Sequence, residues 1–242
     1  MFEIISNNAS VFKEFIGFIR LRVCLYVTSI SIFGFLLFNP LSLKLFLVIF
    51  ATFAATASMY SLNQLSDREE DMINKKVLNR FVVNGKGFYI VISLLFFGLL
   101  FSVLLSMTSF LFLILSVTLG IIYSTLRIKR ISSIKNIYAM ISISLMFLVG
   151  ATANSNSINS ITTIDLIKVY LVLSIYILII SIMADLRDYD GDRLADIKTI
   201  PVMLGYNAGK RVIYLLFILF SILVVIENLI SFYILLCLFH LY

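Results

Sequence analysis

The chain has 242 residues, of which 61% are hydrophobic and only 13% are charged, and its mean hydropathy is +1.07. This composition excludes a soluble globular protein and predicts one polytopic membrane domain over residues 1–242, with no attached soluble domain. The formal net charge of +6 comes without any recognisable nucleic-acid-binding motif. We therefore expect the basic residues to contact anionic membrane lipids and expect no nucleic-acid partner.

Apolar runs long enough to cross a bilayer recur along the whole chain. Residues 1–10 lack a basic region followed by a cleavage site, so we expect the first span to be retained rather than removed. Cys24 and Cys237 lie inside apolar stretches and predict neither a disulfide nor a metal site. We predict eight spans, the last one short, at residues 21–38, 44–66, 87–105, 109–126, 136–153, 164–184, 211–226 and 229–242.

The Lys and Arg residues predict the orientation of these spans. Of the 19 basic residues, 17 lie at the N-terminus or in three segments at the ends of the spans, and only Lys44 and Lys168 lie elsewhere. Loops on the cytoplasmic side carry the excess of Lys and Arg. We therefore expect the N-terminus and four segments to be cytoplasmic, namely 1–22, 67–86, 127–135 and 185–211.

Two groups of acidic residues lie in these segments. The first acidic cluster consists of Asp67 and Asp71, which follow the second span, together with Asn63 in the last turn of that span. Its members recur every four residues, so on a helix they stack along one face at about 6 Å per step.

The second acidic cluster follows the sixth span and consists of Asp185, Asp188 and Asp192. Asp188 and Asp192 repeat the four-residue step, and Asp185 lies one turn earlier. A single cluster of this kind is more often a solvated charge run than a site. Two clusters with matching spacing on the same predicted side favour two or three Mg²⁺ ions that hold a diphosphate.

The two clusters resemble the aspartate-rich motifs of the UbiA superfamily of intramembrane prenyltransferases. The first family motif, N-[D/x]-x-x-D-x-x-x-D, is matched by the first acidic cluster, with Gln64 where Asp is common. The second, D-x-x-x-D, is matched by Asp188 and Asp192, and the Lys-Thr-Ile-Pro-Val-Met-Leu-Gly segment at 198–205 is also similar to the family. Further positions that resemble the family are Asn74, Lys75, Arg80, Gly85, Tyr123, Ser124, Arg127, Lys129 and Asn136.

This sequence also departs from the family pattern. It keeps Arg20 but lacks the Pro and Asn that follow this Arg in many relatives. Asp190 and Asp196 stand where Glu and Gly are frequent, which makes the second cluster unusually acidic. The family typically has nine spans, whereas eight are predicted here.

The resemblance implies an all-α transmembrane helix bundle whose active site lies on the cytoplasmic side. It implies Mg²⁺-dependent transfer of a prenyl group from a polyprenyl diphosphate to a lipophilic acceptor, with release of diphosphate. The expected catalytic residues are Asp67, Asp71, Asp188 and Asp192. The expected Mg²⁺ ligands are Asn63, Asp67, Asp71, Asp185, Asp188 and Asp192. The expected substrate-binding residues are Asn63, Arg68, Arg80, Tyr123, Lys129 and Arg20.

The acceptor stays open at this point, because family members prenylate aromatic rings, quinone precursors, porphyrin-type rings and glycerol-phosphate ethers. The Ile-, Asn- and Lys-rich composition indicates an AT-rich microbial genome, and the Asp188-x-Asp-Gly-Asp sequence resembles both archaeal lipid-ether enzymes and chlorophyll- or quinone-type enzymes. We therefore favour an archaeal or bacterial lipid or quinone pathway. A cation transporter would place its acids at mid-span rather than at the ends. A CDP-alcohol phosphotransferase would carry D-G-x-x-A-R, which is absent after Asp190. A non-catalytic or shortened member of the same fold is the remaining alternative.

Overall fold

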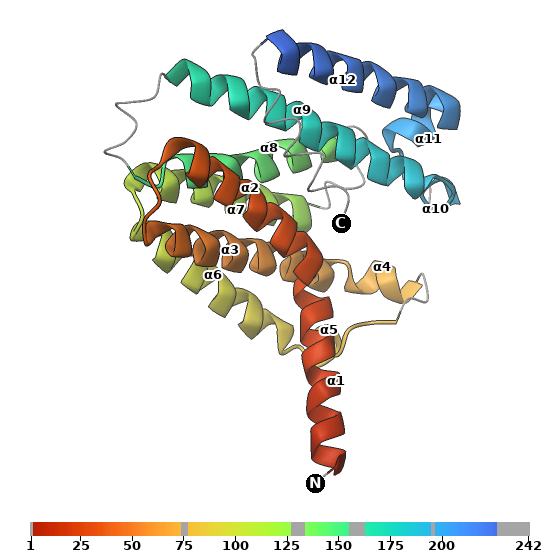
Figure 1. The fold of residues 1–242 in the computed structure, drawn as a ribbon. Helices are drawn as coiled ribbons and strands as arrows, with labels where there is room; N and C mark the ends of the chain where they lie inside the picture. The colour runs from red at the N-terminus through yellow and green to blue at the C-terminus, as the bar shows by residue number, and fades with distance from the viewer. Residues whose placement is uncertain (1, 74–76, 127–133, 155–162, 195–196, 227–242) are drawn as a thin grey trace. The chain divides into compact units, whose positions relative to one another are not determined.

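The computed structural model describes the chain except for residues 1, 74–76, 127–133, 155–162, 195–196 and 227–242. Every regular element in the described residues is an α-helix (Figure 1), which confirms the predicted all-α class. The helices are α1 (Phe2–Ile19), α2 (Leu21–Phe38), α3 (Lys44–Ser66), α4 (Arg68–Ile73), α5 (Arg80–Val83), α6 (Gly87–Val103), α7 (Met107–Thr125), α8 (Ile134–Ala151), α9 (Thr163–Arg187), α10 (Tyr189–Leu194), α11 (Ile200–Leu204) and α12 (Tyr206–Ile226).

Six of these helices are long and apolar enough to cross a membrane, judged by length and composition: α2, α3, α7, α8, α9 and α12. Helix α6 is apolar as well but has only 17 residues. Each of the first seven predicted spans falls on one of these seven helices, whereas the eighth, 229–242, lies outside the described residues. The chain is therefore an integral membrane protein.

Two differences from the predicted elements have a common cause. Helix α12 begins at Tyr206 rather than at residue 211, and α1 was not predicted as a helix. Both segments mix apolar and polar residues, so a search for uniformly apolar runs passes over them.

The chain forms two compact units, each described by itself below. Unit 1 comprises Met1–Ile128 and Leu145–Ser160, and unit 2 comprises Lys129–Ser144 and Ile161–Tyr242. The boundary falls inside α8, whose first part belongs to unit 2 and whose last part belongs to unit 1. The single domain expected over residues 1–242 stays a prediction.

In unit 1, helix α3 packs against α1, α2, α6 and α7. The buried face of α3 consists largely of small residues, among them Ala51, Ala55 and Ser58. Such residues let helix backbones approach closely, which is the usual basis of helix association in a membrane. On α6, the absence of a side chain at Gly98 allows the close contact with α3, because a Cβ atom there would lie only 2.9 Å from the backbone nitrogen of Ala55.

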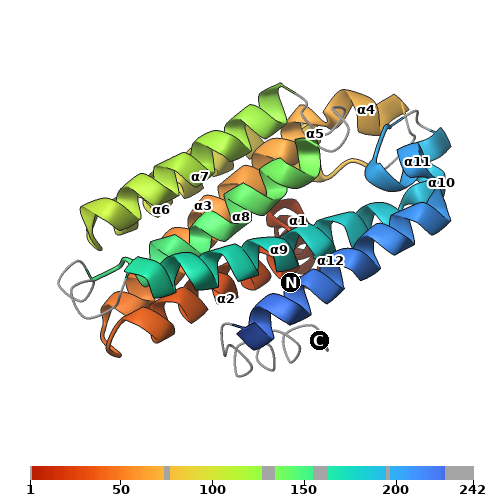
Figure 2. The ribbon, with the colours of Figure 1, turned by 90° about the horizontal axis from the view of Figure 1, so that it is seen from above.

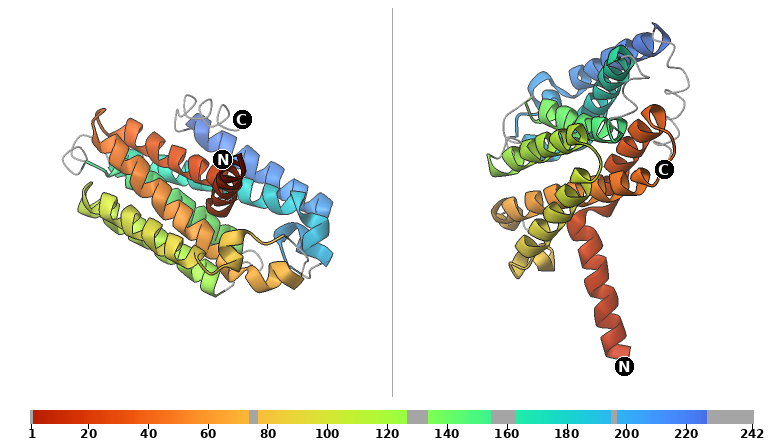
Figure 3. Two further views of the ribbon diagram at one scale, coloured as in Figure 1. Left: turned by 90° about the horizontal axis from the view of Figure 1, so that it is seen from below. Right: turned by 90° about the vertical axis from the view of Figure 1, so that its left-hand side faces the viewer.

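Helix α1 leaves the rest of unit 1 at a steep angle (Figure 3), and the joint with α2 is formed by Arg20. Arg20 has φ 52° and ψ 56°, a left-handed conformation that non-glycine residues rarely adopt. Gln64 Nε2 of α3 donates hydrogen bonds to the carbonyl oxygens of Gly17, at 3.1 Å, and Phe18, at 2.9 Å. The Cys24 thiol donates to the next carbonyl oxygen at 2.9 Å. Side chains of α2 and α3 thus satisfy the end of α1 and hold the joint in place.

In unit 2, α9 and α12 run side by side, and the short helices α10 and α11 follow the end of α9 (Figures 1 and 2). The rings of Tyr176 and Phe220 pack together between α9 and α12, with centroids 5.6 Å apart. Pro201 lies in the first turn of α11, and Gly205, at φ 89°, allows the sharp turn into α12. This path places the second acidic cluster at the end of α9 and in α10.

Candidate functional site

The first acidic cluster has the predicted helical geometry. The Asp67 backbone nitrogen donates to the Asn63 carbonyl oxygen at 3.0 Å, and the Asp71 nitrogen donates to the Asp67 carbonyl oxygen at 2.9 Å. Each member therefore lies one turn after the last, across the junction of α3 and α4. The Asn63 side-chain Nδ2 also donates to Asp67 Oδ2 at 3.0 Å. This bond orients the Asp67 carboxylate and leaves the Asn63 side-chain oxygen as a further oxygen ligand.

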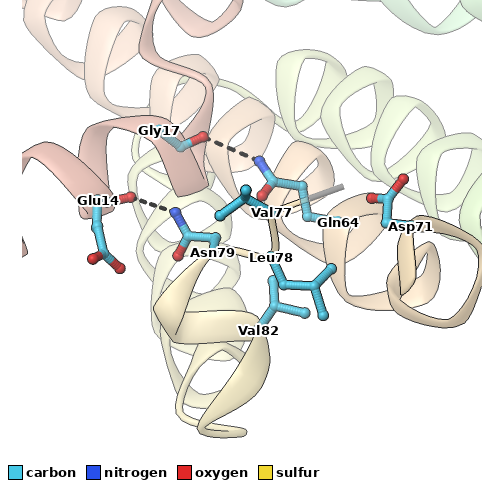
Figure 4. Close-up of a pocket in the computed structure, with 8 residues that line it drawn as sticks. All are labelled: Glu14, Gly17, Gln64, Asp71, Val77, Leu78, Asn79 and Val82. Atoms are coloured by element: carbon cyan, nitrogen blue, oxygen red, sulfur yellow. Dashed lines mark hydrogen bonds between the residues drawn. The ribbon is translucent and has the colours of Figure 1, made fainter. Parts of the chain in front are cut away.

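A pocket of about 390 Å³ lies beside this cluster within unit 1 (Figure 4). Asp71 lines it from α4, and Gln64, Glu14 and Asn79 line it from α3, α1 and the segment before α5. Asn79 Nδ2 donates to the Glu14 carbonyl oxygen at 2.8 Å. The amide groups of Gln64 and Asn79 are thus both bound to α1, and α1 forms one wall of the pocket next to Asp71.

The predicted substrate-binding residues of unit 1 lie on several helices. Arg20 is exposed at the joint of α1 and α2, where its guanidinium lies 5.8 Å from the centroid of the Tyr60 ring. Arg68 and Arg80 are exposed at the first positions of α4 and α5. Tyr123 is half-buried in the last turns of α7. One further predicted residue, Lys129, lies outside the described residues.

The second acidic cluster also has helical geometry. The Asp188 nitrogen donates to the Ala184 carbonyl oxygen at 3.1 Å, and the Asp192 nitrogen donates to the Asp188 carbonyl oxygen at 2.9 Å. The Arg187 guanidinium donates to both carboxylate oxygens of Asp188, at 3.0 and 3.1 Å. Because both side chains are more than half exposed, at 76% and 56%, this ion pair contributes little to stability and exchanges readily.

Asp185 is buried and has a different environment from Asp188. Its Oδ1 lies 2.7 Å from Lys135 Nζ, and its Oδ2 accepts a hydrogen bond from Asn136 Nδ2 at 3.0 Å. Asn136 Nδ2 also donates to Ser181 Oγ at 2.9 Å. Both oxygens of Asp185 therefore have protein partners from the first turn of α8. The predicted role of Asp185 as a metal ligand stays a prediction.

Asp192 lies at the edge of this network, with Oδ2 4.0 Å from Lys135 Nζ. Burial raises the pKa of the Asp192 carboxyl above its ordinary value. The positive charge of Lys135 opposes this shift, and the negative charges of Asp185 and Asp188 add to it. The carboxylates of the second cluster are thus close enough to repel one another.

The two clusters fit Mg²⁺ in their chemistry. All the candidate ligands are carboxylate or amide oxygens, which a hard divalent cation prefers, and a cation would relieve the repulsion at Asp192. Within the part of the chain that the structure describes, no three His, Cys, Asp or Glu side chains converge as a metal site. Each cluster by itself thus offers too few ligands for a complete metal centre, and each would need water or substrate oxygens to complete one.

Three residues of these networks could not be identified from the sequence: Lys135, Ser181 and Gln64 in its role at the α1 joint. In the sequence Lys135 is one of several basic residues in the segment 127–135, and its only distinguishing signal is that it directly precedes Asn136, a position that resembles the family. Ser181 gave no signal, because a serine in an apolar run is usually bound to its own helix.

The fold and the two helical acidic clusters together define a class, the all-helical membrane proteins with paired aspartate motifs. The sequence pattern of the UbiA prenyltransferase family matches residues 24–242, and the chain belongs to this family. The expectation of a prenyltransferase is confirmed at this level.

Individual relatives agree with this assignment. A digeranylgeranylglyceryl phosphate synthase of Pyrococcus horikoshii is 26% identical over 201 residues, which cover 80% of this chain and 69% of that protein. The enzyme of the same name from Haloquadratum walsbyi is 28% identical over 169 residues, or 67% of this chain and 56% of that protein. A solved UbiA homologue from Archaeoglobus fulgidus, bound to DMAPP and Mg²⁺, superposes with a TM-score of 0.76 at 21% identity, covering 93% of this chain and 86% of that one. At this identity the superposition establishes the fold.

Proposed function

We propose that residues 1–242 act as one Mg²⁺-dependent prenyltransferase domain that transfers a prenyl group from a polyprenyl diphosphate to a lipophilic acceptor. The observation that carries the proposal is the pair of acidic clusters, each with its aspartates one helical turn apart. Membership of the family and the Mg²⁺ and DMAPP bound by the Archaeoglobus fulgidus homologue support it. We place the N-terminus and the active site on the cytoplasmic side, where 17 of the 19 Lys and Arg residues are predicted to lie.

We assign the metal-binding oxygens to both clusters. Asp67 and Asp71 with Asn63 act from the first, and Asp188 and Asp192 act from the second. These residues would hold Mg²⁺, which would neutralise charge on the diphosphate and so make it a better leaving group. The Asn63–Asp67 hydrogen bond at 3.0 Å preorganises one carboxylate for this task.

Cationic side chains share the binding of the diphosphate in this proposal. Arg20, Arg68, Arg80 and Lys129 supply donors to its oxygens, since charge that develops during bond breaking is best met by preorganised cations. The bond between the prenyl carbon and the diphosphate oxygen breaks, with both electrons leaving on the diphosphate. The acceptor then attacks that carbon and releases its proton. Tyr123 presents an aromatic face that can stabilise a developing allylic cation.

For the acceptor we propose a glycerol-phosphate ether lipid, and for the donor a geranylgeranyl chain. The support is that the relatives from Pyrococcus horikoshii and Haloquadratum walsbyi are named digeranylgeranylglyceryl phosphate synthases. Removal of one geranylgeranyl group from that product leaves geranylgeranylglyceryl phosphate as the acceptor. Its free hydroxyl would attack the donor to form the second ether bond.

The first test is binding of geranylgeranyl diphosphate to the purified protein in detergent, with and without Mg²⁺. We expect Mg²⁺-dependent binding in the wild type and its loss in the Asp67→Asn/Asp188→Asn double variant. Glu69→Gln, an acid on α4 outside the four-residue register, is the matched control and should bind as the wild type does. Binding that persists in the double variant would contradict the metal assignment.

The second test is a turnover assay with two acceptors, geranylgeranylglyceryl phosphate and an aromatic acid such as 4-hydroxybenzoate. We expect an ether product from the first acceptor only. A product from the aromatic acid alone would retain the prenyltransferase proposal and overturn the proposed acceptor.

A further inference from the structure

Lys135 is a largely buried basic residue of unit 2. Its side chain is 16% exposed and lies between two carboxylates of the second acidic cluster. A buried ammonium group is costly unless nearby negative charge compensates it. Lys135 is therefore the local counter-ion of this cluster.

The two contacts of Lys135 differ in a way that suggests a division of roles. The 2.7 Å distance to Asp185 Oδ1 is that of a strong charge-assisted hydrogen bond. The 4.0 Å distance to Asp192 Oδ2 is too long for a hydrogen bond, so only electrostatic attraction remains. Lys135 is thus anchored by Asp185 and only loosely associated with Asp192.

The anchor itself is fixed from a second side. Asn136 Nδ2 binds the other oxygen of Asp185 at 3.0 Å and also Ser181 Oγ at 2.9 Å. Asn136 and Ser144 of α8 are buried, and Ser174 Oγ donates to Ser144 Oγ at 3.0 Å, which ties this part of α8 to α9. The position of the Lys135 ammonium is therefore set by packing between helices rather than by a flexible loop.

We propose that Lys135 is a diphosphate-binding residue that compensates the charge of Asp192 before substrate binds. When Asp192 takes part in metal binding, the ammonium of Lys135 stays on Asp185 and donates to a diphosphate oxygen. Asp185 acts in this arrangement as a positioning residue. The inference rests on the proposed function, because it requires a diphosphate at the second cluster.

The arrangement couples the binding of metal and diphosphate. Without diphosphate, the positive charge of Lys135 competes with a metal ion for the carboxylates. With diphosphate bound, the same charge is attracted to the ligand. Removal of Lys135 should therefore have opposite effects on the two ligands. Metal alone should bind about tenfold more tightly, and diphosphate should bind about tenfold more weakly. This is the size of effect expected for one charge a few ångströms away at water-like screening.

The experiment measures two affinities in the purified full-length protein in detergent. Mn²⁺ binding without diphosphate is followed by electron paramagnetic resonance, and geranylgeranyl diphosphate binding in saturating Mg²⁺ by calorimetry. Lys135→Met is compared with Lys210→Met, a control in the same unit whose ammonium lies 4.6 Å from the Tyr206 ring centroid. We expect both affinities to change in Lys135→Met and neither to change in Lys210→Met.

Loss of one partner of a buried ion pair can destabilise the fold. The Lys135→Met/Asp185→Asn double variant removes both charges and keeps a hydrogen-bond acceptor for Asn136. It should fold and still bind diphosphate weakly, whereas Lys135→Arg should retain most of the diphosphate affinity. Wild-type diphosphate affinity in the folded double variant would overturn the inference and leave the proposed function intact. A wild-type protein that binds neither Mn²⁺ nor diphosphate would overturn both.

Discussion

The close contact between α2 and the last part of α8 within unit 1 gives a prediction whose magnitude follows from the structure. A Cβ atom at Gly150 would overlap the Ser31 carbonyl oxygen and lie 2.9 Å from the Phe35 nitrogen. Neither obstacle can rotate away, because both are backbone atoms of a helix. Gly150→Ala must therefore push the two helices apart.

The expected cost is the balance of two effects. Overpacking costs about 1–3 kcal/mol where side chains can adjust, and backbone obstacles place Gly150→Ala at or above the upper end of that range. Alanine is favoured over glycine in a helix by about 1 kcal/mol, which offsets part of this. We expect a net loss of about 2–3 kcal/mol, which corresponds to a fall in melting temperature of about 4–12 °C for a chain of this length.

A graded series provides the controls. At Gly120 the nearest atom to an added Cβ is the Met59 sulfur, at 2.8 Å, and this flexible side chain can move aside. At Gly191 nothing lies within 4 Å. Thermal unfolding in detergent should therefore rank Gly150→Ala well below Gly120→Ala, and Gly191→Ala at or slightly above the wild type. Equal melting temperatures for Gly150→Ala and Gly120→Ala would refute the argument that backbone contact holds α2 against α8.

Three further predictions concern the candidate site. Acidification should raise the Mg²⁺ concentration needed for half-maximal diphosphate binding. Because the pKa of Asp192 is raised, this carboxyl takes up a proton at a higher pH than an ordinary aspartate, and a protonated carboxyl is a poor metal ligand. A Mg²⁺ requirement that stays constant from pH 7 to about 5 would contradict this, since ordinary carboxyls titrate near 4. Gln64→Ala should lower the melting temperature by about 2–8 °C, because the carbonyl oxygens of Gly17 and Phe18 each lose one of their two donors. Gln64→Glu should lower it too, since a carboxylate cannot donate. Arg20→Gly should be more stable than Arg20→Ala by about 1 kcal/mol, because glycine adopts the left-handed conformation without strain. Both variants should bind geranylgeranyl diphosphate more weakly than the wild type. Equal melting temperatures of the two variants would show that the joint is not strained.

The sequence predicted the parts of this molecule that depend on local spacing. A four-residue repeat fixes one helical turn regardless of context, so the relation of Asp67 to Asp71 followed from the chain. The long apolar runs likewise predicted seven of the described helices, because an apolar segment that crosses a bilayer must satisfy its backbone hydrogen bonds internally, as a helix does. The left-handed Arg20 was not predictable, since an arginine carries no signal for that conformation.

The contacts of Asp185 were not predictable either, and they change the interpretation of the second cluster. By spacing, Asp185 is a third carboxylate one turn before Asp188. In the structure its oxygens are bound by Lys135 and Asn136, which lie 50 and 49 residues earlier in the chain. Long-range pairs of this kind depend on how α8 packs beside α9, and no pattern within either helix specifies that packing.

The second cluster carries positive charge of its own, because Lys135 and Arg187 bring two positive charges to three aspartates. A metal ion that binds at this cluster without substrate must compete with these cations for the carboxylates, whereas a bound diphosphate attracts the same cations. The charges of the second cluster therefore favour binding of metal and diphosphate together over binding of metal alone.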